Sequence, residues 1–230
     1  KIPCPRGVTP VEVTLKFKVK FKADGSLDKR KARLVARGFK QIYLKSYTDT
    51  FAPASQLDSL RLLVSYAAQY KLNISSIDVV GAFLNAKLKE DIWIKFPHDL
   101  PMPALRGRTA KLKKSLYGLK QAAHDWWKLL RGLLSEGMGL DIRENSKDPC
   151  LYHLFSDHLI VIILVHVDDC IIAYSNDKFI NAFRKKIEEE YEITFNLKPD
   201  QLLGIQIEHF PNRGGFRLTN TRLIDEIVRT

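Results

Sequence analysis

The sequence is poor in cysteine and has no long hydrophobic run. Its three cysteines, Cys4, Cys150 and Cys170, form no C-x-x-C pair and cannot all be joined in disulfides. This disfavours a disulfide scaffold or a structural zinc site and suits a reducing compartment. The longest apolar run covers residues 159–165, far short of the roughly 20 residues that cross a bilayer. No signal-peptide pattern is present. We therefore expect a protein without membrane contact.

Positive charge is present in excess. The 230 residues include 37 Lys and Arg against 26 Asp and Glu, a net charge of +11, and 45% are hydrophobic. This is the composition of a globular protein with one large domain or two small ones. Two zones hold the excess: residues 1–47 contain 13 basic and 3 acidic side chains, and residues 106–131 contain 8 and 1. Such zones predict a surface for a polyanion such as nucleic acid; the alternative is that the lysines are simply solvated.

The hydrophobic pattern predicts interleaved strands and helices of an α+β fold. Alternation over residues 13–21 and 31–37, with a turn at 23–26, predicts a two-stranded hairpin with a basic face. Further strands are expected at residues 73–80, 92–96, 151–155, 159–165, 171–174, 205–208 and 216–218, the last two turning at 212–215. Helices are expected at residues 58–70, capped by Asp58, and at 120–136 and 178–191. Without a regular βαβα order, an antiparallel sheet with helices on one face fits best.

Two adjacent aspartates, Asp168 and Asp169, interrupt the most apolar part of the chain. The flanking strands leave only residues 167–168 for a turn, so the carboxylates are expected at the tip of a tight hairpin. Two like charges beside an apolar sheet are costly unless a cation neutralises them. Mg²⁺ suits this task because it prefers one or two carboxylates plus substrate phosphates. An ordinary polar turn is the equally weighted alternative.

A third carboxylate, Asp78, falls at the end of the strand expected over residues 73–80. If that strand neighbours the hairpin, three carboxylates converge at one edge of the sheet. They would form the ligand set for two metal ions about 4 Å apart, which activate a hydroxyl and stabilise a leaving phosphate. On its own, Asp78 is more often a cap or a turn residue.

A basic stretch at residues 111–121 surrounds Gly118. A glycine lets the backbone approach a ligand closely, and the lysines and tyrosine around it are suited to phosphate and base. A basic helix start with a structural glycine is the alternative.

Seven segments together resemble the reverse transcriptase of copia-type LTR retrotransposons. They are residues 31–39, 50–53, 77–85, 112–122, 148–152, 167–169 and 203–207. Their order and spacing match over nearly the whole chain. The resemblance implies a right-hand polymerase with an antiparallel palm sheet, a basic fingers hairpin and a partial thumb. It implies fingers at about residues 1–77 and 86–122, palm at 78–85 and 123–200, and a primer-grip hairpin with the start of the thumb at 201–230.

The resemblance also implies the roles of individual residues. Asp78, Asp168 and Asp169 correspond to the catalytic, metal-binding aspartates, with the Val79 carbonyl as a further ligand. Phe83 corresponds to the sugar gate that selects deoxynucleotides. The remaining dNTP-binding residues implied are Lys31, Arg33, Tyr117, Gly118 and Lys120, and those near primer or template are His166, Gln121, Leu203 and Gly204. Lys198 is placed on the triphosphate side.

The implied activity is RNA-directed DNA polymerisation, in which dNTPs are added to a primer 3′-hydroxyl. The implied cofactor is Mg²⁺, with Mn²⁺ as a substitute, and the implied partners are an RNA template, a DNA or RNA primer and dNTPs. The implied location is a cytoplasmic virus-like particle and the nucleus. Two positions depart from the family: His166 replaces the usual tyrosine, and Ala123 the usual proline. The chain stops before a complete thumb or an RNase H region, so we expect one part of a longer polyprotein. The alternative is an inactive or truncated remnant that binds nucleic acid.

Overall fold

The computed structural model describes residues 4–21, 26–137, 141–210 and 215–228. The chain forms two compact units, each built from two separate stretches of sequence. Unit 1 comprises Lys1–Ala52 and Ala82–Leu129, and unit 2 comprises Pro53–Gly81 and Leu130–Thr230. The turns expected at residues 23–26 and 212–215 lie largely outside the described residues, so neither is tested.

Unit 1 is organised around a four-stranded sheet of order β2-β1-β4-β5. Its strands are β1 (Val11–Phe21), β2 (Leu27–Ala36), β4 (Trp93–Lys95) and β5 (Thr109–Lys111). β1 and β2 form the expected antiparallel hairpin, and β4 joins β1 in parallel. Three short 3₁₀ turns belong to this unit: η1 (Gly38–Lys40) follows β2, η2 (Ala82–Asn85) precedes β4, and η3 (Pro103–Leu105) lies between β4 and β5. The core packs the sheet against the start of α2 (Ala122–Gly132).

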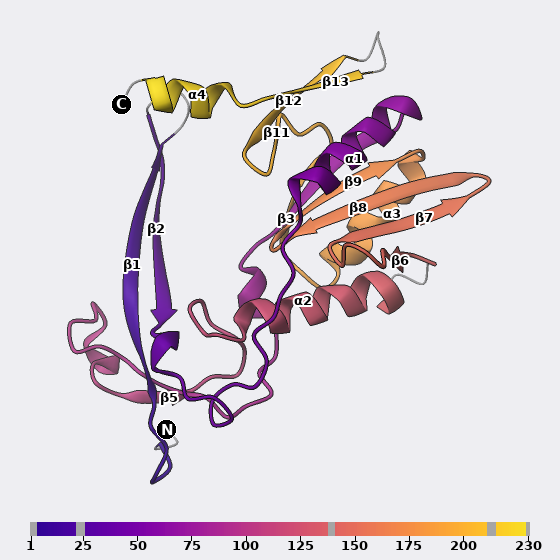
Figure 1. The fold of residues 1–230 in the computed structure, drawn as a ribbon. Coiled ribbons are helices and arrows are strands. Elements are labelled where there is room, and N and C mark those ends of the chain that lie inside the picture. The colour runs from indigo at the N-terminus through magenta and orange to yellow at the C-terminus, as the bar shows by residue number, and fades with distance from the viewer. Residues whose placement is uncertain (1–3, 22–25, 138–140, 211–214, 229–230) are drawn as a thin grey trace. The chain divides into compact units, whose positions relative to one another are not determined.

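Unit 2 contains a six-stranded antiparallel sheet of order β10-β3-β9-β8-β7-β6 (Figure 1). The strands are β3 (Asn73–Val79), β6 (Arg143–Glu144), β7 (Leu151–Ser156), β8 (Leu159–His166), β9 (Asp169–Tyr174) and β10 (Ile193–Asn196). The central β8–β9 hairpin is joined on one side by β7 and on the other by β3. This brings the strand that carries Asp78 next to the strand that carries Asp169.

Helices cover both faces of this sheet. On one face, α1 (Leu57–Gln69) shares a core with Ile162 and Ile171. The alternate residues Ile163 and Ile172 point to the opposite face and are fully buried as well. There, α3 (Asp177–Glu188) runs along β9. The expectation of helices on one face only is therefore wrong. The continuous apolar run in β8 and β9 is the signal for burial on both sides.

A small three-stranded sheet completes the core on the α1 side. Its strands are β11 (Gln201–Leu202), β12 (Ile205–Phe210) and β13 (Gly215–Thr219), followed by α4 (Thr221–Val228). Leu202 and Ile207 are buried in the same core as α1. The hairpin expected over residues 205–218 is thus confirmed, and it is anchored to the central sheet by apolar contacts.

The ends of three elements differ from the sequence expectation. Asp58 does not cap α1; the N-cap is Gln56, and Asp58 instead pairs with Arg61 one turn later, at 3.1 Å. β9 begins at Asp169, two residues earlier than expected. α2 begins at Ala122 and is followed by a π-helical turn, η4 (Leu133–Gly137). None of the described helices combines the length and the apolar character needed to cross a lipid bilayer.

Candidate active site

The β8–β9 hairpin turns tightly at Val167 and Asp168, as the sequence predicts. His166 and Asp169 are the last register pair of the hairpin, so only two residues form the turn. Val167 has a φ angle of 58°, which is unusual for a β-branched residue. Two-residue turns of this kind normally place glycine at the first position. The backbone is therefore strained at the point where it presents the aspartates.

Asp78 and Asp169 are direct register partners on the antiparallel strands β3 and β9. Partners in such a pair project their side chains to the same face of the sheet. A backbone hydrogen bond from the Val79 N–H to the Asp168 carbonyl, at 2.9 Å, ties the turn to β3. From the sequence, the carboxylates are expected to converge if the strand of Asp78 neighbours the hairpin. The pairing of β3 with β9 meets this condition.

The carboxylates influence one another electrostatically. The pKa of Asp169 is raised to about 6, first by burial and then by the negative charges of Asp168 and Asp78. His166 acts in the opposite direction. Like charges held in a partly buried setting favour a cation that neutralises them.

The side chains do not form a complete cage for a metal ion. Within the described ranges, no group of three or more His, Cys, Asp or Glu side chains is arranged to hold one. The expected three-carboxylate ligand set is thus not confirmed. Mg²⁺ does not require such a cage, because it commonly takes one or two carboxylates and completes its shell with water and substrate phosphates. The Asp78–Asp169 pair with Asp168 in the adjoining turn fits a hard divalent cation of this kind.

A cavity of about 420 Å³ adjoins the hairpin tip. It is lined by His166, Asp169, Gln201, Leu203 and Gly204. The family resemblance implied that three of these residues lie near primer or template, and the structure brings them together beside Asp169. The two residues of the β11–β12 turn, Leu203 and Gly204, both have positive φ angles, 49° and 82°.

A serine that the sequence analysis did not single out fixes the orientation of His166. The Ser55 Oγ lies 2.9 Å from the His166 Nδ1. Ser55 precedes α1, far from His166 in the chain, and its type carries no motif signal. Only the packing of α1 against the central sheet shows this contact.

In unit 1, three of the nucleotide-binding candidates contact one another: Phe83, Tyr117 and Arg33. The Phe83 and Tyr117 rings meet edge to face, with centroids 5.6 Å apart. The Arg33 guanidinium lies over the Tyr117 ring at 5.5 Å. Gly118 follows with a φ of 87°, and a Cβ there would lie 2.2 Å from the Ala36 carbonyl oxygen. The glycine is thus needed for close contact between this loop and β2, which supports the structural alternative for the motif.

The β1–β2 hairpin carries cations on one face. The register pairs Lys16 with Arg33, and Lys18 with Lys31. A further pair joins Lys20 and Lys29. Like charges directly opposite each other destabilise a sheet, and a bound polyanion would relieve this repulsion. The basic face predicted from the alternation is therefore confirmed.

Gln121 does not suit the predicted contact with primer or template. Its side chain is only 1% exposed. Its amide nitrogen donates to the Ser46 carbonyl at 2.9 Å and to Glu90 at 3.2 Å, and its oxygen accepts from Gln41 at 3.0 Å. These bonds engage both ends of the amide, so Gln121 supports the surrounding loop from inside.

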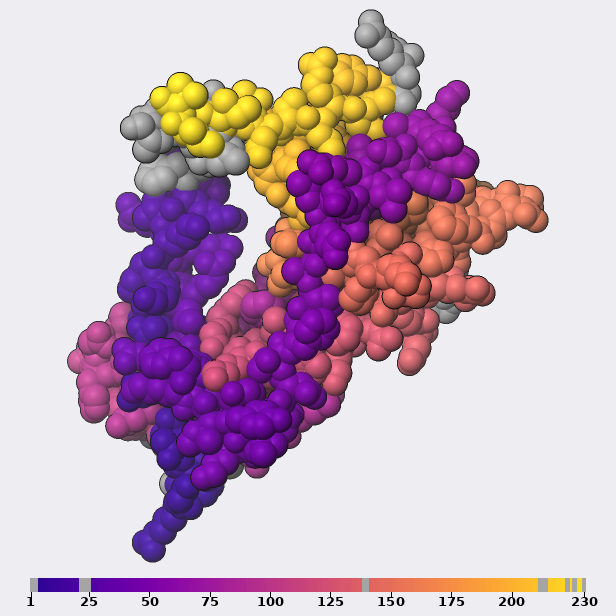
Figure 2. Space-filling view, in the orientation of Figure 1, coloured from indigo at the N-terminus to yellow at the C-terminus, as the bar shows by residue number. Residues whose placement is uncertain are grey.

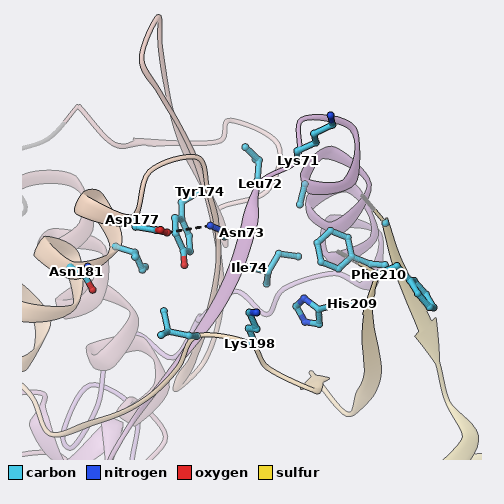
Figure 3. A pocket seen from close by; sticks show the side chains of 15 residues that line it. Lys71, Leu72, Asn73, Ile74, Tyr174, Asp177, Asn181, Lys198, His209 and Phe210 are labelled. Atoms are coloured by element: carbon cyan, nitrogen blue, oxygen red, sulfur yellow. Dashed lines mark hydrogen bonds between the residues drawn. The ribbon is translucent and has the colours of Figure 1, made fainter. Parts of the chain in front are cut away.

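Lys198 lies near the start of β3. It lines a cavity of about 730 Å³ together with Asn73, Ile74 and His209 (Figure 3). Asn73 begins β3, whereas Asp78 lies near the other end of that strand. The assignment of Lys198 to the triphosphate side stays a prediction, and this placement does not support it. The sequence carried no signal for this cavity, which forms where β3, α3 and the β12–β13 hairpin meet.

Comparisons with known proteins give matches over nearly the whole chain. The family described as reverse transcriptase (RNA-dependent DNA polymerase) matches residues 2–230. The chain is 30% identical over 225 residues to a retrovirus-related Pol polyprotein from transposon TNT 1-94 of Nicotiana tabacum, covering 97% of this chain and 17% of the relative. It is 31% identical over 229 residues to that of transposon RE1 of Arabidopsis thaliana, covering 99% and 15%. A Ty1-ER2 Gag-Pol polyprotein of Saccharomyces cerevisiae is 29% identical over 205 residues, covering 82% and 10%. The chain spans less than a fifth of the length of these relatives.

Proposed function

Since the chain belongs to the reverse transcriptase family of copia-type retrotransposon Pol polyproteins, we propose that it is an RNA-directed DNA polymerase. It would add deoxynucleotides to a primer 3′-hydroxyl, with release of pyrophosphate. The observation that carries this proposal is the register pairing of Asp78 with Asp169 beside the strained turn at Asp168. Carboxylates at such a sheet edge suit nucleotidyl transfer, which depends on charge stabilisation.

Asp78, Asp168 and Asp169 would hold the divalent cations, with the Val79 carbonyl as a further ligand. When bound, Mg²⁺, or Mn²⁺ in its place, would lower the cost of negative charge on the attacking and leaving oxygens. The chain contributes the fixed position of these carboxylates. The β3–β9 ladder and the Val79–Asp168 hydrogen bond set that position before substrate arrives.

The residues of unit 1 would bind the incoming nucleotide. Lys31 and Arg33 belong to the cationic face of the β1–β2 hairpin and suit the triphosphate. Lys120 and the backbone at Gly118 would complete the nucleotide site. Phe83 would exclude a ribose 2′-hydroxyl by contact with its ring. The edge-to-face contact with Tyr117 limits the movement of Phe83, which supports a steric role.

The primer terminus would lie beside His166 and the Leu203–Gly204 turn. These residues share one cavity with Asp169. Ser55 holds the imidazole of His166 in place. Gln121 is left out of this site because it is buried in unit 1.

One observation favours a second function, a non-catalytic module that binds nucleic acid. His166 stands where the family usually has tyrosine. Such a module would show salt-sensitive binding without primer extension. The three aspartates proposed to bind metal ions, Asp78, Asp168 and Asp169, are all present, which supports the polymerase.

The deciding experiment is primer extension on a primed RNA template with Mg²⁺ and dNTPs. We expect extension by the wild-type chain and its loss in Asp168→Asn. Asp58→Asn is the matched control, because Asp58 is exposed on α1 and pairs only with Arg61 among the contacts seen. Extension by Asp168→Asn at the wild-type rate would refute the assignment. No extension by the wild type with either Mg²⁺ or Mn²⁺ would favour the binding module.

A further inference from the structure

The cavity of about 730 Å³ in unit 2 takes no part in the proposed reaction. It lies at the end of the β3–β9 ladder where Asn73 pairs with Tyr174, whereas Asp78 and Asp169 pair at the other end. A strand rises about 3.3 Å per residue, which puts the two ends about 17 Å apart. Figure 2 shows α1, in purple, packed between the three-stranded sheet in yellow and the central sheet in orange. The cavity adjoins the end of α1, and its volume is in the range of small-molecule sites, about 300–1,000 Å³.

The floor of this cavity is apolar and buried. Leu72, Ile74 and Ile180 contribute to it, and none of them is more than 5% exposed. Tyr174 also lines the cavity, and its hydroxyl is already bonded to the Ser75 Oγ at 3.0 Å. Burial of a polar group without a partner costs free energy. The part of a ligand that enters deepest must therefore be apolar.

Aromatic rings from the β12–β13 hairpin form one wall of the cavity. They belong to His209, Phe210 and Phe216. The His209 and Phe216 rings meet edge to face, with centroids 5.1 Å apart and planes at 75°. The His209 Nε2–H donates to the Pro199 carbonyl at 3.0 Å, which fixes the imidazole. Because rings prefer edge-to-face or offset aromatic neighbours, the apolar body that suits this wall is itself an aromatic ring.

A cation without an ionic partner stands at the mouth of the cavity. Lys198 is exposed and lines the cavity, and no ion pair of Lys198 occurs among the described residues. Figure 3 shows its side chain directed toward Ile74 and His209, whereas Lys71 points away from them. Hydrogen bonds between an ammonium and a carboxylate are stronger than bonds between neutral groups. The Lys198 ammonium therefore suits an anionic group on the ligand.

An acidic side chain, Asp177, also lines the cavity. Its Oδ1 accepts a hydrogen bond from the Asn73 Nδ2 at 3.2 Å, drawn as a dashed line in Figure 3. Asp177 is the first residue of α3, where the helix dipole favours a negative charge. The lining thus holds two lysines against one aspartate that is already engaged, and its charge is complementary to an anion.

We propose that this cavity binds a small aromatic carboxylic acid. The ring system would lie on the floor at Ile74 and Ile180, against the wall formed by His209 and Phe216. The carboxylate would remain at the mouth and accept a hydrogen bond from the Lys198 ammonium. This site is independent of the proposed polymerase reaction, because it lies at the opposite end of β3 from Asp78 and uses none of the residues assigned to metal or nucleotide.

The first test compares ligands that differ only in charge. Isothermal titration calorimetry of the whole chain in EDTA, without primer or nucleotide, measures 2-naphthoate, the neutral 2-naphthalenemethanol and the cationic 2-naphthylmethylamine. We expect 2-naphthoate to bind with a Kd below about 1 mM. The alcohol should bind about tenfold more weakly, and the amine should not bind measurably. No binding of 2-naphthoate, or equal binding of the three compounds, would overturn the proposal.

Two substitutions at the mouth should act in opposite directions. Lys198→Gln is expected to weaken 2-naphthoate binding about tenfold, because the charged donor is lost. Asp177→Asn should strengthen it about threefold, because a like charge is removed. Lys147→Gln, at an exposed lysine of unit 2 outside the cavity, is the matched control and should bind as the wild type does. Unchanged affinity in Lys198→Gln, or weaker binding in Asp177→Asn with the wild-type unfolding midpoint, would contradict the charge assignment.

The location of the ligand can be observed directly by NMR. In a chain with labelled isoleucine methyl groups, the naphthoate protons should show intermolecular NOEs to Ile74 and Ile180, which line the cavity. Ile224 and Ile227 are more than half exposed on α4 and report non-specific adsorption to the surface. NOEs confined to Ile224 and Ile227 would overturn the proposal. Since neither test involves primer extension, an inactive polymerase would leave this inference standing.

Discussion

Asp78 and Asp169 stand directly opposite each other on β3 and β9, although they lie far apart in the sequence. Their shared face and the backbone bond from Val79 to Asp168 make the site a property of the sheet register. A slip of one residue in this register would place the two carboxylates on opposite faces. The candidate active site therefore depends on the alignment of two strands as much as on the acidic residues themselves.

The first prediction concerns cation binding by these carboxylates. Asp78→Asn is expected to weaken Mn²⁺ binding about tenfold or more, because it removes one of two paired negative charges. Titration of Mn²⁺ followed by electron paramagnetic resonance measures this without any substrate. Asp58→Asn, on the exposed side of α1, should bind Mn²⁺ as the wild type does. Equal binding by Asp78→Asn and the wild type would contradict the metal assignment.

The second prediction concerns sugar selection by Phe83. Phe83→Ala is expected to raise the incorporation of ribonucleotides relative to deoxynucleotides by about 10- to 100-fold. The reason is that the ring fixed against Tyr117 would no longer oppose the 2′-hydroxyl. Competition between rNTPs and dNTPs in single-nucleotide extension measures the ratio. Leu84→Ala, the exposed neighbouring residue, provides the control. An unchanged ratio in Phe83→Ala would count against the sugar gate.

The third prediction concerns the fit of Gly118 against β2. Gly118→Ala is expected to destabilise the chain by about 3 kcal/mol or more. Its Cβ would meet the Ala36 carbonyl oxygen at 2.2 Å, in a backbone conformation that L-residues avoid. Urea unfolding measures the change. Gly132→Ala in α2 has open space around it and should be neutral or stabilising by up to about 1 kcal/mol. Similar effects at both glycines would show that the close contact is not needed.

The fourth prediction concerns the pH dependence of stability through Asp125. Burial raises the pKa of this carboxyl, and the charge of Glu90 adds to the effect. The folded state therefore holds the Asp125 proton more firmly than the unfolded state does. The contribution of this group to stability is present at low pH and is lost as the pH rises through its raised pKa.

Asp125→Asn should consequently stabilise the chain at neutral pH, raising the midpoint of thermal unfolding by roughly 1–3 °C. This advantage should vanish below the ordinary pKa of 3.8, where the wild-type carboxyl is protonated in both states. Thermal unfolding at pH 3 and pH 7.5 compares the two. Asp157→Asn, on the exposed β7–β8 turn, controls for the loss of a surface charge. A variant that is less stable than the wild type at neutral pH would refute the argument.

Local patterns in the sequence determined most elements of the fold. Period-two alternation located the β1–β2 hairpin and its basic face, because a strand sends successive side chains to opposite sides. The two apolar runs around Asp168 left room only for a two-residue turn. The ordered motifs identified the family, which the comparisons confirm. These features depend on neighbours in the chain, so the sequence contains them in full.

Contacts between distant segments were decided by the tertiary structure alone. The pairing of Asp78 with Asp169, the support of His166 by Ser55 and the burial of Gln121 each join residues from separate parts of the chain. Side-chain type sets what Gln121 or Lys198 is able to bond with, but packing sets which partners come within reach. Helices likewise lie on both faces of the sheet, because β8 and β9 carry apolar side chains on each face that must be buried. The amino-acid sequence thus sets which functional groups are present. The register and packing of the strands set which of these groups lie close together.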